Sequence, residues 1–146
     1  MPEAKNFFKE EQVLALGAAI TAAELSTSGE IRVHMEDLCT GSPVERATKV
    51  FQKLRMHRTR LRNGVLFYLA VKDKKFAIVG DQGIHEKVGA DFWDEVKGKM
   101  LERFMKEEFT EGLCEGIGMA GNKLQHHFPF TKGDKNELEN VISFSK

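Results

Sequence analysis

Residues 62–91 read RNGVLFYLAVKDKKFAIVGDQGIHEKVGAD, and we expect the rest of the chain to be arranged around them. Val65–Val71 is an uninterrupted apolar run that is short for a helix, which predicts a central strand covered on both faces. Phe76–Val79 is a second apolar run. It follows the polar residues 72–75, whose length and composition fit a tight reversal. The pattern therefore predicts a hairpin at the centre of the fold.

A glycine-rich segment directly after the hairpin carries several ionisable side chains. Gly80 and Gly83 bracket Asp81 and Gln82, and glycines this close together indicate a sharp turn. We predict a loop here and take it as the first candidate functional site. Its ionisable residues are Asp81, His85, Glu86 and Asp91.

The remaining elements follow from hydrophobic periodicity and from capping residues. A proline and a glutamate follow Ser42 as in a capping box, which predicts the start of a helix. The other expected elements are a helix over Phe8–Leu25, a strand over Glu30–Met35, a helix after Asp91 and a helix from Thr110 to His127. This order predicts an α/β fold in which a small sheet lies between helical layers.

Length and composition limit the organisation and the partners of the chain. At 146 residues, the chain fits one domain over residues 1–130 and a polar tail over residues 131–146, whose last apolar group could add an edge strand. Lys plus Arg equals Asp plus Glu at 22 each, so we expect neither a nucleic acid nor a membrane as partner. Residues 1–5 do not begin a signal peptide, and we expect a soluble cytoplasmic protein.

Two features leave an anion site open. Cys39 precedes Arg46 at a separation one position longer than that of a cysteine-phosphatase loop, and a small buried cysteine is the preferred interpretation. The segment Arg55–Arg62 is strongly basic. We interpret it as a solvated connection, with bidentate contacts to a phosphorylated substrate as the alternative.

Four short motifs occur in the order seen in TPM domains: SGEIRV at residues 28–33, NGVL at 63–66, GDQGI at 80–84, and a Leu113-x-x-Gly116 element. From about Phe8 to Phe128 the sequence resembles this family, also called the TPM phosphatase domain. The resemblance implies a three-layer α/β/α sandwich around a sheet of about four strands. Family members have been linked to acid phosphatase activity and to divalent-metal binding. Relatives often have an acidic residue where this chain has Arg62.

Acidic residues after two predicted strands suggest a metal site. If those strands are neighbours that run the same way, both groups of carboxylates leave from one edge of the sheet. Hard cations prefer such oxygen ligands, so we expect a divalent metal: calcium first, with magnesium, manganese or zinc as alternatives. In the competing interpretation Asp81 serves its turn, Asp91 caps a helix, and Glu86 and Asp37 are solvated. The predicted ligands are Glu36, Asp37, Asp81, Glu86 and Asp91.

Two functions follow from this predicted site. The first is a divalent-metal-binding domain with a regulatory or interaction role, in which the ion holds the two acidic loops together and the protein partner is unknown. The alternative is a metal-dependent acid phosphatase acting on phosphomonoesters, in which the ion polarises a phosphoryl oxygen and activates water.

Overall fold

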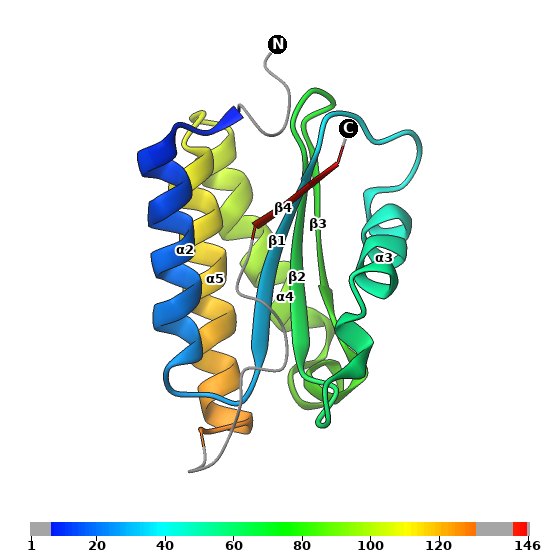
Figure 1. The fold of residues 1–146 in the computed structure, drawn as a ribbon, viewed down its shortest axis with the longest axis vertical. Coiled ribbons are helices and arrows are strands. Elements are labelled where there is room, and N and C mark those ends of the chain that lie inside the picture. The colour runs from blue at the N-terminus through cyan, green and yellow to red at the C-terminus, as the bar shows by residue number, and fades with distance from the viewer. Residues whose placement is uncertain (1–6, 131–141, 146) are drawn as a thin grey trace.

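The structure is a computed structural model that describes residues 7–130 and 142–145. In it, helices cover both faces of a four-stranded mixed sheet (Figure 1). The elements in chain order are α2 (Glu10–Glu24), β1 (Glu30–Glu36), α3 (Pro43–Lys53), the 3-10 helix η1 (Met56–Arg58), β2 (Gly64–Ala70), β3 (Lys75–Gly80), α4 (Gln82–Phe104), α5 (Phe109–His127) and β4 (Ile142–Ser145).

The sheet has the strand order β3-β2-β1-β4. β1 pairs in parallel with both β2 and β4, whereas β2 and β3 are antiparallel. The predicted hairpin and the central position of its first strand are confirmed, since every residue of β2 is buried. The second strand of the hairpin lies at the edge of the sheet.

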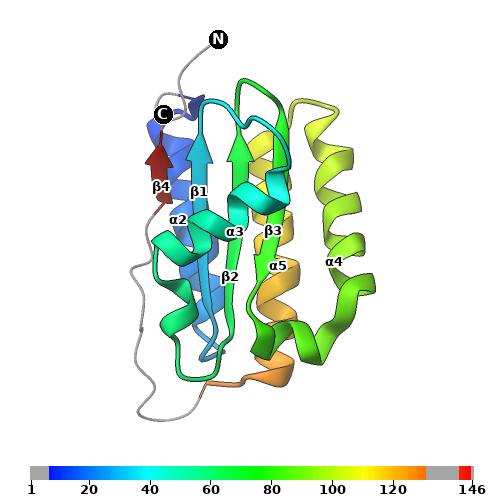
Figure 2. The same ribbon diagram turned by 90° about the vertical axis from the view of Figure 1, so that its right-hand side faces the viewer.

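The uninterrupted apolar run of β2 reflects two separate cores. Val65, Phe67 and Leu69 face the core beneath α2, α4 and α5. The alternate residues, among them Leu66 and Tyr68, face a smaller core beneath α3. Figure 2 shows α3 alone in front of the sheet, with the other three long helices behind it. The predicted α/β/α sandwich is therefore confirmed.

Two glycines in α5 allow this helix to pack closely against its neighbours. A Cβ atom at Gly116 would lie 2.6 Å from the sulfur of Met100 on α4, and one at Gly121 would lie 2.7 Å from the Cβ of Ala23 on α2. Close approach of both neighbouring helices therefore requires glycine at these two positions.

The prediction of a loop after the hairpin is wrong, because helix α4 begins at Gln82 with Asp81 as its N-cap. Gly83 is needed for space and not for a turn: a Cβ atom there would lie 2.1 Å from the carbonyl oxygen of Leu61. The chain bends later, at Gly89, whose φ of 73° interrupts α4.

Residues 142–145 of the C-terminal segment form β4, which lies beside β1 at the sheet edge (Figure 2). Residues 131–141 lie outside the described part of the chain. Among the described helices, none combines the length and apolar character needed to cross a membrane.

Candidate functional site

The predicted carboxylates lie at opposite ends of the sheet, which corrects the two-loop metal site. β3 is antiparallel to β2, so Asp81 follows β3 at the end where β2 begins, and its N–H donates to Gly64 O at 2.9 Å. Glu36 is opposite Ala70, the last residue of β2. A seven-residue strand spans roughly 20 Å. One ion therefore cannot hold both groups together.

Asp81 is committed to structural contacts at its end of the sheet. The carboxylate is 7% exposed and accepts from the Gln82 N–H at 2.8 Å, which caps α4. It also accepts from Arg62 Nε at 2.6 Å and from Arg62 Nη2 at 2.8 Å. Its counter-ion is thus the arginine that stands where relatives often have an acidic residue. Glu86 and Asp91 are exposed positions along α4.

Three of the four family motifs, those at residues 28–33, 63–66 and 80–84, meet at this same end of the sheet. The side chain of Asn63 donates to Ser28 Oγ at 3.3 Å, and the Glu30 N–H donates to Asn63 O at 3.4 Å. The Gly83 N–H donates to Arg62 O at 2.8 Å. These contacts join the starts of β1, β2 and α4, so a role in holding the fold accounts for the motif residues.

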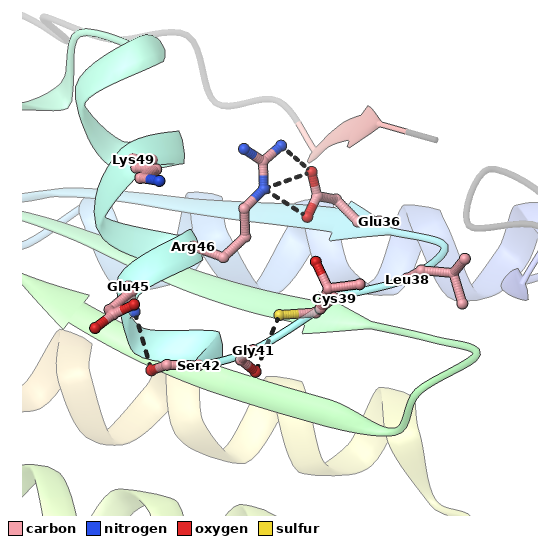
Figure 3. A pocket seen from close by; sticks show the side chains of 9 residues that line it. Glu36, Leu38, Cys39, Gly41, Ser42, Glu45, Arg46 and Lys49 are labelled. Carbon is pink, nitrogen blue, oxygen red and sulfur yellow. Dashed lines mark hydrogen bonds and ion pairs between the residues drawn. The ribbon is translucent and has the colours of Figure 1, made fainter.

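A buried polar cluster occupies the other end of the sheet, around Glu36. Glu36 is 2% exposed, and its carboxylate accepts from Arg46 Nε at 2.9 and 3.0 Å and from Arg46 Nη2 (Figure 3). It also accepts from the hydroxyl of Tyr68. Burial by itself would raise the pKa of Glu36, but the hydrogen bonds from Arg46 and Tyr68 outweigh it and hold the pKa below its usual value. Glu36 is therefore charged, and Arg46 is its counter-ion.

His34 connects this cluster to β4. It is 4% exposed, and its Nδ1 and Nε2 lie 2.6 Å from Ser143 Oγ and 2.9 Å from Ser145 Oγ. Burial lowers the pKa of His34 to about 4, although Glu36 opposes this shift. The imidazole is therefore neutral at pH 7, and the 3.8 Å approach of His34 to Glu36 is not an ion pair there.

A polar pocket of about 410 Å³ opens beside Glu36, between the end of β1 and α3 (Figure 3). The turn between β2 and β3 fixes its wall: the Cys39 N–H donates to Asp73 Oδ2 at 2.7 Å, and Lys75 Nζ donates to Cys39 O at 2.9 Å. The loop that follows β1 and bounds the pocket is thus fixed by hydrogen bonds to Asp73 and Lys75. Its lining residues are Glu36, Leu38, Cys39, Thr40, Gly41, Ser42, Glu45, Arg46 and Lys49.

The spacing of Cys39 and Arg46 does not produce a phosphate-encircling loop. The Arg46 guanidinium points to Glu36, whereas the Cys39 sulfur lies 4.0 Å from Gly41 O (Figure 3). Cys39 is 3% exposed, in agreement with its interpretation as a small buried residue. Asp37 begins the loop, with Lys72 Nζ at 3.9 Å from its carboxylate.

Within residues 7–130 and 142–145, no group of three or more His, Cys, Asp or Glu side chains is placed to hold a metal ion. Of the predicted ligands, only Glu36 lines the pocket. The neighbours of Glu36, namely Arg46, Tyr68 and His34, were not predicted from the sequence. The available signal was a tyrosine inside an otherwise apolar central strand, because a buried hydroxyl normally requires a polar partner.

Residues 3–123 match the TPM domain family. The chain belongs to that family. It is 43% identical to the BA42 protein from the psychrophilic bacterium Bizionia argentinensis, whose NMR structure matches with a TM-score of 0.91 over 99% of this chain and 100% of that one. The search of curated proteins found no match.

Two more distant structures share the fold. The N-terminal domain of cg2496 from Corynebacterium glutamicum is 12% identical, with a TM-score of 0.64, and the match covers 93% of this chain and 80% of that one. The N-terminal domain of a protein from P. gingivalis is 16% identical, with a TM-score of 0.69 and coverage of 86% and 84%. At these identities the likeness concerns the fold alone.

Proposed function

We propose that this TPM domain is a regulatory binding domain whose ligand carries a phosphate or a similar oxyanion, together with a divalent cation. The proposed site is the pocket between the end of β1 and α3. One observation carries the proposal: Arg46 and Lys49, three residues apart on α3, both line this pocket. Residues at this spacing lie on the same face of a helix.

The bond to Glu36 prepares Arg46 for an anion. Nε and Nη2 of Arg46 donate to Glu36, while the arginine side chain is 36% exposed. A guanidinium has five donors in a rigid fork, so Nη1 can donate to a ligand without a change in orientation. Lys49 is exposed and has no ion-pair partner among the described residues. Its charge is therefore available to a ligand.

A divalent cation fits such a site without three protein ligands. Magnesium keeps several of its waters and is commonly bound by one or two carboxylates together with phosphate oxygens. Glu45 lines the pocket and is exposed, so it can supply one carboxylate. Zinc fits less well, because His34 is already held by two serines. We therefore propose magnesium or calcium.

We favour binding over hydrolysis because Ser42 and Cys39, two of the three hydroxyl or thiol side chains that line the pocket, are engaged or buried; the third is Thr40. The Ser42 hydroxyl accepts from the Glu45 N–H at 3.3 Å and caps α3. The Cys39 thiol is buried. In the acid phosphatase alternative, a metal-activated water would be the nucleophile.

Calorimetry and amide NMR with inorganic phosphate, in the presence of magnesium or calcium, test the proposal. We expect amide shifts over residues 38–49 and tighter phosphate binding when the cation is present. Lys49→Ala should weaken binding roughly tenfold through loss of a charge-assisted contact. Lys99→Ala removes another exposed lysine, from α4 on the opposite face of the sheet, and should bind like the parent.

Three results would contradict the proposal. Phosphate could fail to bind with either cation present. Lys49→Ala could bind as tightly as Lys99→Ala, which would exclude the pocket. Finally, steady hydrolysis of p-nitrophenyl phosphate by the parent, lost in Lys49→Ala, would replace the binding role with the acid phosphatase.

A further inference from the structure

The outer edge of β1 is filled by the end of the same chain. β4 pairs in parallel with the second half of β1, from Val33 opposite Ile142 to Glu36 opposite Ser145. Figure 2 shows β4 with β1 as its sheet neighbour and open space beyond it. β4 has four residues, none of them fully buried, and Phe144 is 40% exposed. Within the described part of the chain, β4 therefore has β1 as its only strand neighbour.

His34 recognises two hydroxyl groups on this strand. Ser143 and Ser145 are alternate residues, so their side chains point to the same face of the strand. A neutral imidazole has one donor and one acceptor nitrogen, so one serine donates to His34 and the other accepts from it. Ile142 packs against the main core. The outer edge of β1 thus fits a strand in which an apolar residue is followed by a hydroxyl residue, any residue and a second hydroxyl residue.

None of these contacts depends on β4 belonging to the same chain. Backbone pairing, the two serine contacts and the apolar contact of Ile142 would be the same for any extended segment with this pattern. Addition of a strand to an open sheet edge is a common mode of peptide recognition. A tethered segment competes at an effective concentration of about 1 mM. A partner segment that makes further contacts can bind tightly enough to displace β4 despite this effective concentration.

We propose that the outer edge of β1 is a strand-acceptor site for an extended segment of another protein, and that β4 is its displaceable intramolecular occupant. The segment has the pattern apolar, hydroxyl, any residue, hydroxyl, with His34 as the specificity-determining residue. This site is separate from the phosphate pocket proposed above, and its occupant is a peptide.

A labelled peptide with the sequence VISFSK of residues 141–146 tests the site by fluorescence anisotropy against the full chain. In the full-length double variant Ser143→Ala, Ser145→Ala, the intramolecular strand competes less. We expect this variant to bind the peptide roughly thirtyfold more tightly than the parent does, since each of the two lost hydrogen bonds contributes about 1 kcal/mol. Amide shifts should concentrate on residues 33–36. A peptide with alanine at both serine positions is the matched control.

A second preparation keeps the test decisive. A specific protease site inserted within residues 131–141 and then cut leaves all residues present but removes the tether, and the peptide should then exchange with β4. The proposal is overturned if neither the double variant nor the cut chain binds the peptide at about 1 mM. It is also overturned if the alanine peptide binds equally well. A concentration-dependent dimer in place of peptide binding would assign the edge to a second copy.

Discussion

Lowering the pH should destabilise this domain through His34. The pKa of His34 is lowered from 6.5 to about 4, so the unfolded chain takes up a proton at a higher pH than the folded chain does. Stability is then fully present above pH 6.5 and is lost as the pH falls from 6.5 toward 4. At 1.36 kcal/mol for each pKa unit, the loss from this residue is about 3 kcal/mol.

Urea denaturation at a series of pH values measures this loss, and His34→Gln is the matched variant. Glutamine keeps a donor and an acceptor for Ser143 and Ser145 but does not titrate. We expect the variant to be less stable at pH 7 and to have a much flatter pH dependence between 6.5 and 4. Glu36 contributes at lower pH, because its depressed pKa matters only below its ordinary value of 4.5. An equal decline in parent and variant would refute the assignment to His34.

Three further substitutions test other contacts by urea or thermal denaturation. Tyr68→Phe should cost about 1–2 kcal/mol, because the buried Glu36 carboxylate loses a donor, and an unchanged stability would argue against that bond. Asp81→Ala should lower the free energy of unfolding by about 1–2 kcal/mol through the lost N-cap but leave phosphate binding unaltered. Altered binding would contradict the proposed pocket, because Asp81 lies at the other end of the sheet. Gly83→Ala should cost about 2–3 kcal/mol, because the added Cβ meets the Leu61 carbonyl oxygen, and a neutral effect would mean that the backbone shifts freely.

The sheet and its helices could be predicted because local signals agreed with the packing. The buried run that forms β2 indicated a covered strand, and the Ser42 hydroxyl accepts from the Glu45 N–H at the predicted start of α3. A loop after β3 was predicted wrongly because the sequence does not show why Gly83 is a glycine. A glycine required by close packing looks the same in the sequence as a glycine required by a turn. Only the position of the Leu61 carbonyl, which is remote in sequence, distinguishes these cases.

The predicted two-loop site failed for a topological reason that the hairpin already contained. A hairpin returns its second strand to the start of the first, so Asp81 had to lie near Gly64. The helix between β1 and β2 makes these strands parallel, which sends Glu36 to the far end. The partners of Glu36 could not be predicted in this way. Arg46 and Tyr68 come from different elements, and their side chains meet only after the smaller core has packed.

The pairing of β4 with β1 also has a kinetic consequence. His34 and Ser143 are separated by 109 positions along the chain, so closing this contact carries a larger loop entropy than the local pairing within the β2–β3 hairpin. Segments also emerge during synthesis from the N-terminus onward, so β1 is complete long before β4 exists. During synthesis, the nascent chain therefore has an open strand edge at β1 until β4 has been made. Unpaired edges of this kind are sites of aggregation. Once β4 has been made, it closes the edge that would otherwise recruit other chains.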